Sequence, residues 1–142
     1  MTDRVTMSPQ DVGASRNRDV VARMYADLSR GDGEAVLAAL SEKIEWVVAE
    51  GLPYGGTYRG RDAVLADVFG RLDTEWEDLA VVPTELVAVG DVVISLGHYQ
   101  GRGRGTGKAM TARFAHVWRF EQGVPVAFET IADTRVMVAA MV

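Results

Sequence analysis

The sequence TARFAHVWRFEQGVPVAFETIAD, residues 111–133, decides the fold. Two runs of alternating apolar residues flank Glu121–Gly123, which is the pattern of a β-hairpin. Successive side chains of a strand point to opposite faces of the sheet. One face of the hairpin therefore carries Phe114, His116, Trp118 and Phe120 from the first strand, and Phe128, Thr130 and Ala132 from the second. Such a face is either plain core or the wall of an apolar pocket with a polar group at its centre.

The composition is that of one ordinary globular domain. The chain has 142 residues, of which 48% are hydrophobic and 25% charged. The absence of cysteine excludes disulfides, thiolate metal sites and cysteine nucleophiles. A formal net charge of −5 argues against nucleic acid as a partner. Because the two histidines are far apart and no nucleotide-binding motif is present, we expect neither a metal nor a cofactor.

Targeting signals are not visible in the sequence. No apolar run reaches the ~18 residues that a membrane-spanning helix needs, and the N-terminus lacks the apolar segment of a secretory signal. We therefore expect a cytoplasmic protein without membrane contacts. Residues 1–16 are polar and lack an apolar period, which predicts a flexible N-terminal arm, so that residues 17–142 form a single domain.

The spacing of apolar residues predicts helices first and strands afterwards. The predicted elements are a helix from near Asn17 to Gly31, a short helix capped by Asp32, a strand at 44–50, a helix at 63–72, strands at about 78–89, 91–101, 108–121 and 124–132, and a short helix capped by Asp133. Four glycines and a proline predict an irregular loop at 51–60. This order is typical of an α+β fold, in which a cone-shaped, curved antiparallel sheet packs against three helices and encloses a pocket.

Three segments, together with this order of elements, resemble a known superfamily. LSRGD at 28–32, GTYRGRDAV at 56–64 and FAHVWRF at 114–120 are similar to the SnoaL-like, ketosteroid-isomerase-like branch of the nuclear-transport-factor-two-like (NTF2-like) superfamily. The resemblance covers about residues 17–140. It implies the cone-shaped fold and a homodimer, and it leaves the activity open, because this scaffold hosts many reactions and also members that only bind.

The resemblance also implies a changed catalytic centre. Ketosteroid isomerase uses an aspartate base together with a tyrosine and a protonated aspartic acid. Met24 stands at the position of the tyrosine, Trp46 at that of the base and His116 at that of the aspartic acid. Limonene epoxide hydrolase, another member, uses two carboxylates and an arginine, and Thr130 stands at one carboxylate position. We therefore expect neither of these two reactions.

The candidate catalytic residues are His116, Tyr54 and Glu50. A neutral imidazole in an apolar surrounding can transfer a proton or stabilise an oxyanion. The alternative is a buried histidine tied to a backbone carbonyl or a tyrosine. Tyr54 is either a donor to a bound carbonyl or a surface tyrosine, and Glu50 is either an inward carboxylate base or a solvated glutamate at a strand end.

The candidate ligand-binding residues are mostly aromatic. They are Met24, Trp46, Tyr58, Tyr99, Phe114, Trp118 and Phe128. His98 and Tyr99 are neighbours on one strand, so only one of them can face inward. The sequence favours Tyr99 without deciding the point.

Three functional hypotheses remain. In the first, the pocket holds a hydrophobic small molecule, carbonyl-bearing or polycyclic, and performs cofactor-independent acid–base chemistry of the isomerase, cyclase or hydratase type. In the second, the same pocket serves a carrier or sensor without catalysis. In the third, the protein is a dimerisation or interaction module and its cavity is filled by its own side chains.

Overall fold

The computed structural model describes residues 9–142, which form an α+β fold around a six-stranded sheet with the order β2-β1-β6-β5-β4-β3. In chain order the elements are α1 (Pro9–Ser29), α2 (Gly33–Ala39), β1 (Glu45–Val48), β2 (Gly56–Arg59), α3 (Arg61–Ala63), η1 (Val64–Phe69), α4 (Gly70–Glu75), β3 (Trp76–Val89), β4 (Val92–Gly103), β5 (Ala109–Glu121), β6 (Val124–Ala132) and α5 (Thr134–Met141). The segments α3, η1 and α4 follow one another without a break, and η1 is π-helical. The α+β class and the curved sheet were predicted correctly.

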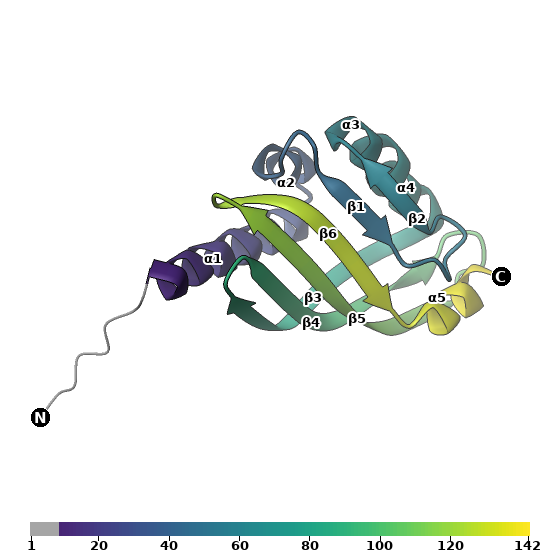
Figure 1. Ribbon diagram of the computed structural model, residues 1–142. Coiled ribbons are helices and arrows are strands. Elements are labelled where there is room, and N and C mark those ends of the chain that lie inside the picture. Colours follow the sequence, from purple (N-terminus) through teal and green to yellow (C-terminus); the bar gives the residue numbers. More distant parts are fainter. Residues whose placement is uncertain (1–8) are drawn as a thin grey trace, which may run out of the picture.

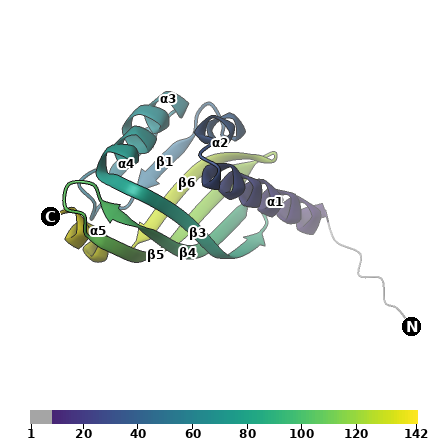
Figure 2. The ribbon, with the colours of Figure 1, turned by 180° about the vertical axis from the view of Figure 1, so that it is seen from behind.

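The long helix α1 covers one side of the sheet. It lies behind the sheet in Figure 1 and in front of it in Figure 2, and it packs against β3 and β4. Helix α5 packs against β5. The two predicted helix caps are confirmed, because Asp32 Oδ1 accepts the Ala35 N–H at 3.1 Å and Asp133 Oδ1 accepts the Val136 N–H at 3.3 Å. These caps fix where α2 and α5 begin.

Strands β5 and β6 form the predicted hairpin. His116 lies opposite Thr130 and Trp118 lies opposite Phe128, while Ser95 of β4 lies opposite His116 on the other side. All five side chains are buried. The alternation read from the sequence therefore assigns the inward face of this hairpin correctly.

Three details differ from the sequence prediction. Helix α1 begins at Pro9 and not near Asn17. A proline lacks an N–H and therefore suits the first turn of a helix. The rest of the predicted arm, residues 1–8, lies outside the described residues. The stretch predicted as an irregular loop at 51–60 contains β2, an edge strand in which glycine is tolerated because it pairs only with β1. Strand β1 runs parallel to β6, which is possible because a long connection separates the two strands.

Strand β3 forms the other edge of the sheet and is irregular. Its pairing with β4 shifts between Glu77 and Ala80, and again between Pro83 and Glu85. Asp78, inside the first irregularity, has a φ of 54°. Such bulges bend a strand and increase its twist, so β3 is not a flat, continuous edge.

Gly97 of β4 leaves room for an aromatic ring. A Cβ atom at this position would lie 2.8 Å from Phe114 Cζ and 2.2 Å from the Val82 carbonyl oxygen. Phe114 in turn stacks on His116, with ring centroids 3.8 Å apart and planes at 7°. The missing side chain at Gly97 therefore allows the stacking that supports the imidazole.

We expect Gly97→Ala to destabilise the protein by about 1–3 kcal/mol, because the added methyl group overpacks the Phe114 ring and a backbone carbonyl. Gly13→Ala is a matched control: it lies in α1 with no atom within 4 Å of the added Cβ, and should stabilise by up to about 1 kcal/mol. Urea denaturation measures both changes. A Gly97→Ala variant as stable as the wild type would contradict the close approach.

Candidate functional site

A cavity of about 810 Å³ opens between the inward face of the sheet and the helices. Its wall includes side chains from α1, η1, β1, β3, β4, β5 and β6. Aromatic rings make up much of this wall: Tyr25, Trp46, Tyr54, Phe69, Trp76, Tyr99, Trp118 and Phe128. The cavity has the size and the apolar character of a small-molecule site.

The rings on one side of the cavity pack against one another. The centroids of Trp46 and Phe128 are 3.9 Å apart, and those of Trp118 and Phe128 are 4.5 Å apart. Phe69 of the π-helical segment η1 meets Trp46 edge to face at 5.8 Å. Because each ring is fixed by its neighbours, this part of the wall is rigid.

His116 is buried in the wall and is bound through both of its ring nitrogens. Its Nδ1 lies 2.6 Å from Tyr25 Oη, and its Nε2 lies 2.6 Å from Tyr99 Oη. The hydrogen bonds continue at both ends, because Trp118 Nε1–H donates to Tyr25 Oη at 3.2 Å and Tyr99 Oη lies 3.1 Å from Thr130 Oγ1. We call this set, Trp118–Tyr25–His116–Tyr99–Thr130, the imidazole–tyrosine chain.

The imidazole–tyrosine chain is uncharged near neutral pH. Burial lowers the pKa of His116 to about 3, so the imidazole is neutral. Burial also raises the pKa of Tyr25 to about 12, against the smaller opposing effects of Ser95 and Trp118. The pKa of Tyr99 is raised by burial first, and then by the charges that Tyr25 and Tyr54 would carry as phenolates. Both phenols therefore keep their hydrogens.

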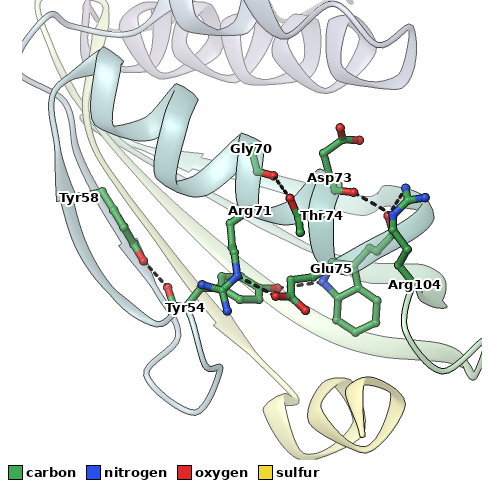
Figure 3. A network of polar contacts seen from close by, with 9 residues as sticks. Tyr54, Tyr58, Gly70, Arg71, Asp73, Thr74, Glu75 and Arg104 are labelled. Atoms are coloured by element: carbon green, nitrogen blue, oxygen red, sulfur yellow. Dashed lines mark hydrogen bonds and ion pairs between the residues drawn. The ribbon is translucent and has the colours of Figure 1, made fainter.

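Tyr54 is the centre of a second polar group. Its Oη accepts a hydrogen bond from Trp76 Nε1–H at 3.0 Å. Figure 3 shows Arg71 beside Tyr54, with the guanidinium carbon 5.6 Å from the centre of the ring and Nε donating to Glu75 at 2.8 Å. Burial raises the pKa of Tyr54, so this phenol is neutral as well. The Tyr54 side chain is thus held at its hydroxyl by the Trp76 indole and at its ring by the Arg71 guanidinium.

Arg104 is bound to the backbone at the junction of α4 and β3. It donates to the Asp73 carbonyl at 3.1 Å and to the Trp76 carbonyl at 2.9 Å (Figure 3). Thr74 donates to the Gly70 carbonyl at 3.0 Å within α4. These bonds hold the start of β3 in place, and with it Trp76.

Most of the predicted site residues lie together around the cavity. Met24, Trp46, Tyr54, Tyr99, His116, Trp118 and Phe128 line it. Phe114 lies behind His116 and does not line the cavity. Tyr99 faces inward, whereas His98 contacts Gln100 at 3.1 Å.

Two predicted residues are placed differently. Glu50 was either an inward carboxylate base or a solvated glutamate at a strand end, and the structure agrees with the second alternative: β1 ends at Val48 and Glu50 is exposed in the following turn. Because the alternation of a strand stops where the strand stops, it does not apply at this position. Tyr58 lies in β2 and donates to the Tyr54 carbonyl at 2.5 Å, so it supports the backbone of Tyr54 and does not line the cavity.

Sequence reasoning missed two important residues. Tyr25 falls within the first predicted helix, next to Met24, and its hydroxyl was given no role. The β pattern was read from Trp76 onward, which is where β3 begins, but no role was given to the Trp76 indole. Both residues are large, buried and able to hydrogen-bond, and this combination was the available signal.

Residues 9–142 contain neither a metal site nor a membrane-spanning helix. Within residues 9–142 no group of three His, Asp or Glu side chains is arranged to hold a metal ion. No described helix is long and apolar enough to cross a membrane.

Comparison with known proteins places these features in context. The model of the SnoaL-like domain family matches residues 21–127. An NTF2-like protein of Burkholderia thailandensis E264 is 40% identical, with a TM-score of 0.85 over 89% of this chain and 97% of that chain. An NTF2-like protein of Burkholderia pseudomallei K96243 is 33% identical, with a TM-score of 0.83 over 89% and 97%. TerC, co-crystallised with polyporic acid, is 25% identical, with a TM-score of 0.81 over 89% and 98%. No curated protein matches the chain.

The low pKa of His116 predicts how stability depends on pH. Between its ordinary value of 6.5 and the folded value of about 3, the unfolded chain binds one proton more than the folded chain. This proton lowers stability by up to about 1.4 kcal/mol for each pH unit that the pH falls within that window. Replacing His116 by Gln removes the contribution, so the pH profile of the variant should be flatter.

Urea denaturation between pH 4 and pH 8 measures this difference. His98→Gln is the matched control and should keep the wild-type slope, because His116 is intact in that variant. Parallel profiles for the wild type and His116→Gln would show that His116 is not buried in neutral form.

Proposed function

Because the chain belongs to the SnoaL-like domain family, we propose that it binds a hydrophobic small molecule in its cavity and acts on it by cofactor-independent acid–base chemistry, of the isomerase, cyclase or hydratase type. The observation that carries the proposal is the imidazole–tyrosine chain in the wall of an otherwise apolar cavity. Buried polar groups in such a wall orient a ligand, and they can stabilise charge that develops on it.

The roles within this reaction follow from the hydrogen bonds. His116 is neutral and both of its nitrogens are engaged, so it does not take a proton directly from a ligand. Tyr99 is the member of the chain that both touches His116 and lines the cavity near Thr130. We assign the donor role towards a carbonyl or enolate oxygen to Tyr99, and a positioning role to His116. One preorganised donor of this kind contributes ~10²–10³-fold to a rate.

A carrier or sensor without catalysis is the second candidate. It is favoured by the absence, among the described residues, of a carboxylate bonded to the imidazole–tyrosine chain. Glu50, the candidate carboxylate base, is exposed in a turn. A filled interaction module, the third hypothesis, fits poorly with a cavity of about 810 Å³.

We also propose a homodimer formed through the outer face of the sheet. Ile94 and Val117 lie side by side across β4 and β5, on the face opposite His116. Ile131 of β6 is 55% exposed, Val87 is 44% exposed and Ile94 is 39% exposed. Apolar side chains gathered on one exposed sheet face indicate a surface that another chain covers.

Filling the cavity should abolish ligand binding. Ala132→Trp places an indole on the inward face of β6, whereas Ala127→Trp places the same group on the outward face of that strand. We expect the purified wild type and Ala127→Trp to bind polyporic acid, the compound crystallised with TerC, and Ala132→Trp to lose at least tenfold in affinity. Isothermal titration calorimetry measures the affinity. Equal affinities for both variants would place the ligand outside the cavity.

Turnover separates the enzyme from the carrier. Native mass spectrometry of the purified protein identifies a co-purified ligand, which is then incubated with fresh protein. A catalyst converts this compound, and Tyr99→Phe slows the conversion by about 10²-fold. A carrier releases the compound unchanged.

The dimer proposal predicts a concentration-dependent change in mass. Ile131→Lys introduces a charge into the proposed interface and should give a monomer in sedimentation equilibrium at micromolar concentration. Val142→Lys, at an exposed C-terminal residue, is the control and should leave the dimer intact. A wild-type protein that sediments as a monomer under the same conditions would refute the proposal.

A further inference from the structure

Two tryptophans donate hydrogen bonds to two tyrosines of the cavity wall. Trp118 Nε1–H donates to Tyr25 Oη at 3.2 Å, and Trp76 Nε1–H donates to Tyr54 Oη at 3.0 Å. An indole can only donate, so each tyrosine oxygen already acts as an acceptor. The hydrogens of Tyr25 and Tyr54 must therefore be given to something else.

The hydrogen of Tyr25 goes to His116. If Tyr25 donates to Nδ1, the neutral imidazole carries its own hydrogen on Nε2 and donates it to Tyr99. In the reverse direction, Tyr25 Oη would accept two hydrogens and its own would lack an acceptor. The remaining candidate is the buried Ser95 hydroxyl, which is close enough to Tyr25 to lower its pKa. Its Oγ nevertheless does not have hydrogen-bonding geometry to any group in the described part of the chain, so Ser95 is a poor acceptor for this hydrogen. Because an unpaired buried donor costs free energy, the first direction is preferred.

Tyr99 therefore accepts a hydrogen bond from the imidazole, and its own hydroxyl hydrogen can be donated to another group. The acceptor within its reach among the described residues is Thr130 Oγ1, at 3.1 Å. This is long for a bond between two hydroxyl groups, which are usually ~2.7–2.8 Å apart. A ligand oxygen at the same place can compete for this hydrogen, because Tyr99 and Thr130 both line the cavity.

Tyr54 supplies a second available hydrogen. Its Oη accepts from Trp76, and no acceptor for its own hydrogen is found within residues 9–142. Tyr54 lines the same cavity as Tyr99, and a charge on Tyr54 would raise the pKa of Tyr99, so the two hydroxyls are within electrostatic range. The charged side chains that line the cavity, Asp73, Asp78 and Arg104, are exposed, and Arg104 donates to two backbone carbonyls.

We propose that the ligand is a flat, uncharged ring compound with two hydrogen-bond-accepting oxygens, as in a quinone or a diketone, one bound by Tyr99 and the other by Tyr54. This inference rests on the proposed function, since it requires that the cavity binds an apolar molecule. It adds a criterion for which apolar molecules bind most tightly, namely the number of their carbonyl groups. Two neutral donors in an aromatic wall favour a compound with two carbonyl groups over one with a single carbonyl or none.

A matched set of ligands tests the inference: 1,4-naphthoquinone with two carbonyl groups, 1-tetralone with one, and naphthalene with none. Isothermal titration calorimetry on the full chain should give affinities that fall in this order. Each of Tyr99→Phe and Tyr54→Phe should weaken naphthoquinone binding by about 2- to 10-fold, the usual effect of one neutral hydrogen bond, and the double variant should approach the product. Naphthalene affinity should be unchanged in all three variants, which also shows that the cavity is intact.

Thr84→Val is the matched control. It removes an exposed hydroxyl that donates to the Leu96 carbonyl and does not line the cavity, so naphthoquinone affinity should stay at the wild-type value. Naphthalene binding as tight as that of naphthoquinone, or full naphthoquinone affinity in the Tyr54→Phe and Tyr99→Phe variants, would overturn this inference and leave the proposed function standing. No binding of any of the three compounds would overturn the proposed function along with it.

Discussion

A neutral imidazole bound at both nitrogens is the interaction on which the rest of the site depends. His116 is buried, so each of its nitrogens needs a partner, and the two tyrosines come from different elements, α1 and β4. The bonds at the ends of the chain add Trp118 of β5 and Thr130 of β6. One set of hydrogen bonds therefore fixes the position of the long helix relative to three neighbouring strands. A shift of α1 along the sheet would leave several buried polar groups unpaired at once.

The sequence was sufficient to predict the hairpin of β5 and β6, but it was not sufficient to predict the hydrogen-bond partners of His116. Alternation in β5 predicted that His116 points inward, because that rule needs only the strand itself. It did not predict Tyr25, since the helical period shows which face of α1 is buried but not which strand that face meets. The sequence analysis considered a buried histidine bonded to one tyrosine as an alternative for His116. In the structure His116 is bonded to two tyrosines, Tyr25 and Tyr99.

The errors in the prediction have local physical causes. Glu50 was assigned inward by extending a strand that ends at Val48. The glycine-rich stretch at 51–60 was predicted to be an irregular loop, although the four-residue edge strand β2 within it tolerates glycine. Trp76 was missed because its role depends on Tyr54, which is distant in sequence and is brought close only by the fold. The fold class and most of the cavity wall follow from local patterns, whereas the hydrogen-bonded pairs follow from long-range packing.

The irregular strand β3 has a consequence for how this protein behaves at high concentration. A strand at the edge of a sheet exposes unpaired backbone groups and can recruit the edges of other molecules, which leads to aggregation. In this protein one edge strand is only four residues long, and the other is interrupted by two register shifts and contains Pro83, which lacks an N–H. Neither edge offers a long, straight row of donors and acceptors. Molecules of this chain are thereby discouraged from joining edge to edge into open-ended fibrils.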